Sequence, residues 1–202
     1  MNTENIKIKS EIETQSIVLV GVGGQGILLA SEIIARTIMA SGYDVKMNEI
    51  HGMAQRGGSV VAQIRLGSEV ASPLVPRGTA KVLVSLERIE AMRFVDFLAP
   101  DGLAVVSDQA IIPVTASVGS IPYPEVNEDT LRSVFPNLIY VHALAQTEKI
   151  GNAKAVNTVL LGALSTQFPF PVENWENSIK TTVKPKFVDI NLKAFEIGRH
   201  LK

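Results

Sequence analysis

A glycine-rich turn between an apolar run and a helical pattern is the feature that most constrains the fold of this chain. Residues 16–20 have the sequence Ser-Ile-Val-Leu-Val, which predicts a strand buried on both faces of a sheet. From Gly26 to Ala40 apolar residues recur at helical spacing, and Gly42 follows as a C-terminal cap. The turn between the two elements is GVGGQG. A strand, a glycine-rich turn and a helix in this order are typical of layered α/β proteins.

The four glycines of the turn, Gly21, Gly23, Gly24 and Gly26, match the spacing of the dinucleotide-binding fingerprint. Glycine lets the backbone turn sharply and approach a ligand, and the first turn of a helix offers unpaired N–H groups to an anion. The acid that usually follows about 20 residues later comes late here, at Glu49. The turn therefore predicts either a nucleotide or phosphate-bearing ligand, or only close packing of the strand on the helix.

Strands and helices alternate along the rest of the chain. Residues 59–66 alternate in polarity, which predicts a half-exposed antiparallel strand. We expect an α/β, Rossmann-like three-layer domain with a mostly parallel sheet and an antiparallel excursion. Further strands are predicted at residues 43–50, 81–86, 103–107 and 138–143, and further helices at 87–98, 128–134, 153–167, 172–181 and 190–199.

Length, charge and cysteine content exclude several classes of protein. A chain of 202 residues corresponds to one domain of ordinary size, which we place at residues 16–202 after an N-terminal extension at 1–15. Its 19 basic and 20 acidic residues give a net charge of −1, which argues against a nucleic-acid or membrane partner. The chain has no cysteine, which excludes disulfides, cysteine nucleophiles and iron–sulfur clusters held by its own residues.

The sequence also gives expectations about the surface and the location of the protein. Charged residues make up 19% of the chain, below the ordinary share of about 25%, so we expect another chain to cover part of the surface. The first fifteen residues are polar and mixed in charge, without the apolar run of a secretory signal. The longest uncharged run, residues 14–31, is interrupted by glycines and does not predict a membrane span. We expect a cytoplasmic protein.

A second candidate site is the loop of residues 49–58, EIHGMAQRGG, at the carboxyl end of a predicted strand. Ligands of open α/β sheets bind at that edge. Arg56 can clamp a carboxylate or a phosphate with two hydrogen bonds, and two glycines after it free the backbone to close around the anion. The alternative is a structural corner in which Arg56 pairs with Glu49. The residues of this candidate site are Glu49, His51, Gln55, Arg56, Gly57 and Gly58.

Two asparagines are candidates for supporting roles. Asn152 follows a glycine and suits the N-cap of the next helix. Asn157 falls inside that helix, where asparagine is unfavourable, so it either satisfies the backbone of a neighbouring loop or contacts a ligand. His142 ends an apolar strand and is expected to be a buried histidine rather than a metal ligand. No metal site is expected in this chain.

Four segments taken together resemble the gamma-type domain of the 2-oxoacid:ferredoxin oxidoreductase family. They follow the family's order over residues 16–199, and the stretch HGMAQRGGSV is most similar to the small, beta subunits of its indolepyruvate branch. The segments are VLVGVGGQGILLAS, NEIHGMAQRGGSVVAQIR, KVLVSLERIEAMR, and IGNAKAVNTVLLGALS with NLKAFEIG.

The resemblance implies an oxidative decarboxylation of a 2-oxoacid that uses thiamine diphosphate, transfers the acyl group to coenzyme A and passes two electrons through iron–sulfur clusters to ferredoxin. This chain lacks the cysteines for clusters. It also lacks the Gly-Asp-Gly segment with paired asparagines that binds thiamine diphosphate, and has only Pro100-Asp101-Gly102. Thiamine diphosphate, magnesium and the clusters are therefore expected on a large partner subunit, with coenzyme A as co-substrate.

In this interpretation the loop of residues 49–58 faces the partner's site or the path of coenzyme A. Arg56 would contact a coenzyme A phosphate or a partner carboxylate, and no residue of this chain is assigned a catalytic role. A homodimer of this chain stays open. Two other functions also stay open: a freestanding NAD(P)- or flavin-binding oxidoreductase, favoured by GVGGQG alone, and a non-enzymatic assembly module of the same fold.

Overall fold

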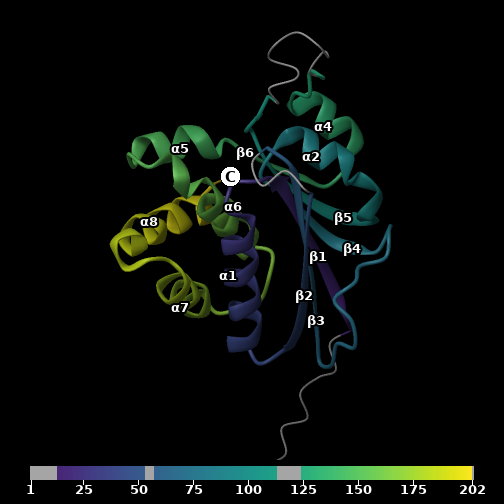
Figure 1. Cartoon of the computed structure of the whole chain (residues 1–202), viewed down its shortest axis with the longest axis horizontal. Coiled ribbons are helices and arrows are strands. Elements are labelled where there is room, and N and C mark those ends of the chain that lie inside the picture. Colours follow the sequence, from purple (N-terminus) through teal and green to yellow (C-terminus); the bar gives the residue numbers. More distant parts are fainter. Residues whose placement is uncertain (1–12, 53–56, 113–123, 202) are drawn as a thin grey trace, which may run out of the picture.

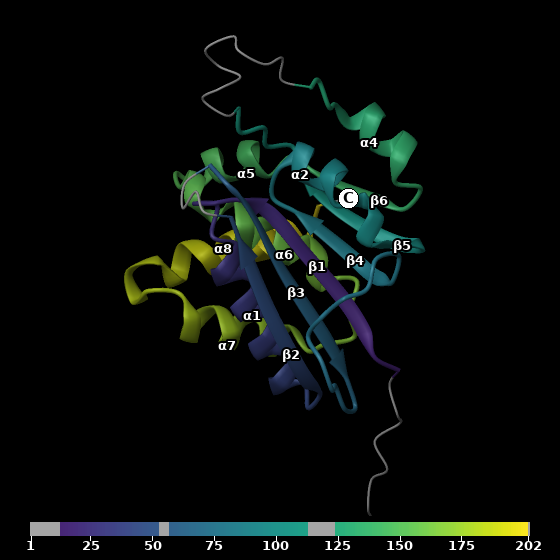
Figure 2. The same cartoon turned by 45° about the vertical axis from the view of Figure 1, so that its right-hand side comes forward.

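The computed structural model describes residues 13–52, 57–112 and 124–201, and a six-stranded sheet forms its centre (Figure 1). The strand order is β2-β3-β1-β4-β5-β6. Strands β1, β4, β5 and β6 run parallel, whereas β3 is antiparallel to both of its neighbours, β1 and β2 (Figure 2). The predicted mostly parallel sheet with an antiparallel excursion is confirmed. The strands are β1 (Gln15–Val22), β2 (Asp44–His51), β3 (Ser59–Gly67), β4 (Ala80–Ser85), β5 (Leu98–Ser107) and β6 (Leu138–Val141).

Helices cover both faces of the sheet, which confirms the three-layer architecture. Helices α1, α6, α7 and α8 lie on one face, at the left in Figure 1, and α2 and α4 lie on the other. The helices are α1 (Ile27–Ala40), α2 (Arg88–Arg93), α4 (Glu128–Val134), α5 (Ala143–Lys149), α6 (Val156–Ser165), α7 (Val172–Thr182) and α8 (Val188–Arg199). Short 3₁₀ turns are η1 (Val95–Phe97), η2 (Ala153–Ala155) and η3 (Pro185–Phe187).

Strand β1 contributes to the apolar cores on both faces of the sheet. Successive side chains of a strand point to opposite faces. Ile17 and Leu19 accordingly belong to the core under α1, and Val18 and Val20 belong to the core under α2. All four are buried, which confirms the prediction from the uninterrupted apolar run. Residues 1–12 of the expected extension lie outside the described residues, and β1 already begins at Gln15.

The predicted half-exposure of residues 59–66 is wrong, because β3 is buried on both faces. Val61 and Gln63, on the face expected to meet solvent, are each only 6% exposed. The segment that leads to Val75 lies over them, and its backbone N–H donates to Gln63 Oε1 at 2.8 Å. Arg65 also donates to this segment, at the carbonyl of Ser72. Polar side chains on this face of β3 therefore form hydrogen bonds with the backbone of the covering segment instead of with water.

Around the second half of the sheet, three element boundaries differ from the prediction by two residues or more. The helix predicted at residues 87–98 ends at Arg93, and β5 already begins at Leu98. Strand β5 therefore includes Pro100, which lies where the register with β4 shifts; proline is tolerated at such irregularities. The strand predicted at residues 138–143 ends at Val141 as β6, and a helix that was not predicted, α5, begins at Ala143.

His142 connects that strand to α5, and its predicted burial is wrong. Its side chain is 63% exposed and lies near the carboxylate of Asp108, with Nδ1 and Oδ2 at 3.4 Å. The histidine is exposed because it stands at the N-cap of α5, where the chain leaves the sheet. Within the described ranges no helix is long and apolar enough to cross a membrane.

Helices α6 and α8 touch through their backbones. A Cβ atom added to Gly162 would lie 2.1 Å from the carbonyl oxygen of Phe195, and one added to Gly198 would lie 2.0 Å from that of Val159. All ten residues of α6 are buried, so neither helix can move aside without disturbing the core. Glycine at both positions is therefore a packing requirement.

We predict that Gly162→Ala lowers the free energy of unfolding by about 1–3 kcal/mol or more, because the added methyl group overpacks the contact between α6 and α8. Urea denaturation followed by circular dichroism measures the change. Gly52→Ala is the matched control, since a Cβ there meets nothing within 4 Å, and its effect should stay within about 0.5 kcal/mol. Equal stability of the Gly162→Ala variant and the wild type would contradict this account of the packing.

Candidate functional site

The two candidate sites predicted from the sequence lie together at the carboxyl edge of β1. The N–H of Gly23, in the glycine-rich turn, donates to the carbonyl of Gly58 at 2.8 Å. The N–H of Gly52 donates to the carbonyl of Ser59 at 3.4 Å and closes the base of the loop between β2 and β3. The turn and the loop are separate motifs in the sequence, and they form one region in the structure.

The glycine-rich turn requires glycine for two different reasons. Gly24 and Gly26 have φ angles of 104° and 81°, which residues with side chains rarely adopt. At Gly21 the limit is space, because a Cβ would lie 2.7 Å from Gln25 Oε1 and 2.9 Å from a methyl carbon of Ile27. The turn is therefore tightly wound around the side chain of Gln25.

The side chain of Gln25 joins the ends of the central strands. Its Oε1 accepts from the N–H of Val22 at 2.7 Å, and its Nε2 donates to the carbonyl of Leu86 at 2.7 Å. The same Nε2 donates to Gln109 Oε1 at 2.8 Å. The strand order reverses between β1 and β4, and that switch point is where α/β sheets usually bind ligands. Here Gln25 occupies it. This role of Gln25 was not predicted from the sequence, because Gln25 stands at a variable position of the fingerprint.

Asn157 lies beside the turn, and Asn152 precedes the helix that carries it. Asn157 is 4% exposed, and its Nδ2 donates to the carbonyl of Gly26 at 3.3 Å. Of its two predicted roles, the structure shows the contact with a neighbouring backbone. Asn152 accepts from the N–H of Lys154 at 3.0 Å and caps η2, the 3₁₀ turn that precedes α6.

The loop residues divide between those that the structure describes and those that it does not. Glu49 Oε1 accepts from the hydroxyl of Ser31 on α1 at 2.9 Å. Gly57 has a φ of 75°, which glycine adopts without cost. Gln55 and Arg56 lie outside the described residues, so the alternative pairing of Arg56 with Glu49 stays a prediction.

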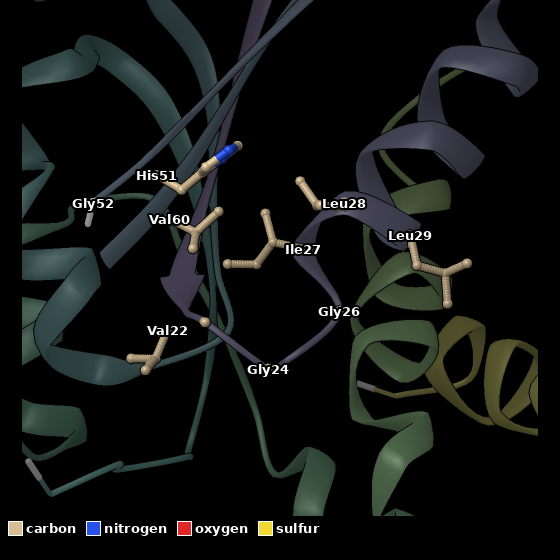
Figure 3. A pocket seen from close by; sticks show the side chains of 10 residues that line it. Val22, Gly24, Gly26, Ile27, Leu28, Leu29, His51, Gly52 and Val60 are labelled. Carbon is tan, nitrogen blue, oxygen red and sulfur yellow. The ribbon is translucent and has the colours of Figure 1, made fainter. Parts of the chain in front are cut away.

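A cavity of about 540 Å³ lies between the loop and the start of α1. Figure 3 shows the side chains of His51, Val60, Ile27 and Leu28 around it. The lining is mainly apolar, with one exposed imidazole and the backbone of the glycine-rich turn. Its volume falls within the range of small-molecule sites, roughly 300–1,000 Å³.

A second cavity, of about 400 Å³, lies on the other side of the same turn. Gly24, Gly26 and Leu29 line both cavities, so the turn forms the wall between them. Amide side chains face the second cavity, and Lys154 supplies a positive charge. In the part of the chain that the structure describes, no group of three or more His, Cys, Asp or Glu side chains could hold a metal ion.

We predict that Gln25→Ala lowers the free energy of unfolding by about 1–3 kcal/mol, because it leaves the Val22 N–H and the Leu86 carbonyl without their partner. Urea denaturation provides the value. Gln167→Ala is the control, since among the described residues that exposed side chain bonds its neighbour Thr166 alone, and we expect a change within about 0.5 kcal/mol. Similar effects of the two substitutions would rule out a structural role for Gln25.

Comparisons with known proteins agree with the fold and identify the family. Residues 16–201 match the family described as pyruvate ferredoxin/flavodoxin oxidoreductase. Over 187 residues the chain is 45% identical to indolepyruvate oxidoreductase subunit IorB of Archaeoglobus fulgidus, covering 91% of this chain and 92% of the relative. The IorB subunit of Pyrococcus horikoshii is 39% identical over 189 residues, covering 91% and 93%. The fold matches pyruvate oxidoreductase subunit PORC of Thermotoga maritima with a TM-score of 0.69 at 23% identity, covering 93% of this chain and 96% of that one. The chain belongs to the pyruvate ferredoxin/flavodoxin oxidoreductase family.

Proposed function

We propose that this chain is the small subunit of a cytoplasmic 2-oxoacid:ferredoxin oxidoreductase that acts on indolepyruvate or a related arylpyruvate. The reaction converts the 2-oxoacid and coenzyme A into an acyl-coenzyme A and carbon dioxide. The two electrons released pass to ferredoxin. The chain contributes to this reaction as part of a complex and is inactive alone.

The observation that carries the proposal is the similarity to the IorB subunits. Two of them, from Archaeoglobus fulgidus and Pyrococcus horikoshii, are 45% and 39% identical to this chain. In both cases about nine tenths of each protein is covered, so the similarity extends beyond a shared motif to the whole subunit. The stretch HGMAQRGGSV, which resembles the indolepyruvate branch, lies within the region that matches the family.

The cofactors of the reaction do not fit this chain and belong on a large partner subunit. With no cysteine, the chain has no thiolate ligands for an iron–sulfur cluster. The chain also lacks the Gly-Asp-Gly segment with paired asparagines that the resemblance to the family leads us to expect where thiamine diphosphate and its magnesium bind. We therefore assign thiamine diphosphate, magnesium and the clusters to the partner, and assign binding and positioning to this subunit.

The region around the glycine-rich turn is the candidate contact with coenzyme A. An apolar cavity on one side of the turn suits the uncharged part of that molecule, and Lys154 beside the other cavity suits a phosphate. The loop of residues 49–58 borders the first cavity through His51 and Gly52. We propose that Arg56 in this loop binds a phosphate of coenzyme A or a carboxylate of the partner subunit.

A freestanding NAD(P)- or flavin-binding oxidoreductase is the less favoured alternative. A dinucleotide at the switch point between β1 and β4 would need the space that Gln25 fills with three hydrogen bonds. The similarity to IorB subunits also favours a subunit over an independent enzyme. A non-enzymatic assembly module is the other alternative, and a redox assay of the isolated complex distinguishes it from the subunit of an enzyme.

Isolation of the tagged chain with its partner tests the proposed function directly. The expected partner is a large subunit with thiamine diphosphate and iron–sulfur clusters. The complex should reduce ferredoxin or a viologen dye in a reaction that depends on coenzyme A and is fastest with indolepyruvate or phenylpyruvate. Preference for pyruvate or 2-oxoglutarate would overturn the arylpyruvate assignment. A partner without redox activity would support the assembly module.

We predict that Arg56→Ala raises the KM for coenzyme A about 10- to 100-fold in the assembled complex, because hydrogen bonds to charged groups contribute roughly 1.5–3 kcal/mol. If the arginine instead binds a carboxylate of the partner, the affinity between the subunits falls by a similar factor. Arg36→Ala is the control, since Arg36 lies on the exposed side of α1 and pairs with Glu32 at 2.8 Å. Unchanged kinetics and assembly of the Arg56→Ala complex would contradict this role.

A further inference from the structure

Helix α2 carries a buried carboxylate that the proposed function does not use. Glu90 is only 4% exposed. One of its oxygens accepts from Arg93 Nη1 at 2.8 Å, and the other accepts from the hydroxyl of Ser59. Burial of a carboxylate is unfavourable unless hydrogen bonds compensate for the lost water, so the burial of Glu90 depends on these two partners.

Neither helix capping nor the ion pair explains the position of Glu90. The N-cap of α2 is Glu87, whose side chain accepts from the N–H of Glu90 at 2.9 Å. The side chain of Arg93 is 59% exposed, and ion pairs with exposed partners contribute little to stability. The hydrogen bond with Ser59 is therefore the interaction that distinguishes Glu90.

Ser59 occupies the base of the loop between β2 and β3. It is the first residue of β3, where it stands opposite Val22 of β1. Its carbonyl accepts from the N–H of Gly52, which closes the loop. The carbonyl of the preceding residue, Gly58, accepts from the N–H of Gly23 in the glycine-rich turn. A change in the position of Ser59 would thus alter both the loop base and the turn that separates the two cavities.

We propose that Glu90 is a positioning residue for the use of coenzyme A: its carboxylate holds the hydroxyl of Ser59 and so orients the base of the loop against the glycine-rich turn. This inference rests on the proposed function, in which that region contacts coenzyme A. Glu90 itself lies on the opposite side of β1 from α1 and does not line either cavity. It acts through Ser59 and Gly58.

The test compares Glu90→Ala, Glu90→Gln and Ser59→Ala in the complex with the large subunit. Loss of the hydrogen bond in Glu90→Ala or Ser59→Ala should raise the KM for coenzyme A roughly 3- to 10-fold. The kcat at saturating coenzyme A and the KM for the 2-oxoacid should stay unchanged. Glu90→Gln keeps an oxygen that accepts from Ser59, so it should restore a KM close to that of the wild type.

The double variant Ser59→Ala with Glu90→Ala should raise the KM no further than either single variant, because both remove the same interaction. Hydrogen–deuterium exchange supplies a second measurement: peptides that contain Gly23 or Gly52 should exchange faster in Glu90→Ala. Glu176→Ala is the matched control, since that carboxylate pairs with Lys180 on the exposed side of α7. It should change neither the KM nor the exchange.

The outcomes separate this inference from the proposed function. A wild-type complex that does not use coenzyme A would overturn the proposed function and the inference with it. A wild-type complex that uses coenzyme A, with an unchanged KM in folded Ser59→Ala, would overturn the inference alone. If Glu90→Ala fails to fold, Ser59→Ala decides, because it removes the same hydrogen bond and keeps the ion pair between Glu90 and Arg93. A Glu90→Gln complex as impaired as Glu90→Ala would also contradict the role assigned to Ser59.

Discussion

The amide side chain of Gln25 is the contact on which the carboxyl edge of the sheet depends. Its oxygen and nitrogen satisfy a backbone N–H at the end of β1 and a backbone carbonyl beyond β4, and its nitrogen also reaches Gln109. These groups would otherwise need a ligand or water at the switch point of the fold. Because the protein fills that position itself, the space for other molecules lies on either side of the glycine-rich turn.

The turn therefore works as a wall between two cavities in addition to starting α1. Asn157 holds it from the side of α6 through the carbonyl of Gly26, and Gly23 bonds it to the loop at Gly58. The chain has no cysteine and therefore offers no thiolate ligand of its own for an iron–sulfur cluster. In the proposed function the subunit contributes walls, charges and loop geometry to a site that a partner completes. Its low share of charged residues is the reason to expect that another chain covers part of the surface.

The sequence predicted the elements whose patterns are local. The apolar run at residues 16–20, the glycine-rich turn and α1 all follow from strand and helix periodicity together with glycine spacing. The alternation of polar and apolar residues in β3 predicted an exposed face wrongly. Gln63 accepts a hydrogen bond from the backbone of a segment that covers this face, and the sequence of that segment has no periodic pattern. Helix α5 is seven residues long and follows a strand directly, so it lacked both the length and the cap that predict a helix.

The interactions that define the site were harder to predict than the elements that carry it. Gln25 and Ser59 are ordinary polar residues in the sequence, and their partners at Leu86 and Glu90 are distant along the chain. The contact between Gly162 and Gly198 depends in the same way on how α6 and α8 cross.

We propose that the chain acts only as a subunit of a coenzyme A-dependent oxidoreductase. The most direct measurement titrates the purified chain into the cofactor-loaded large subunit and follows indolepyruvate-dependent dye reduction. Activity that rises to a plateau at a fixed ratio of the two chains is the predicted result, and activity independent of the added chain would contradict the account.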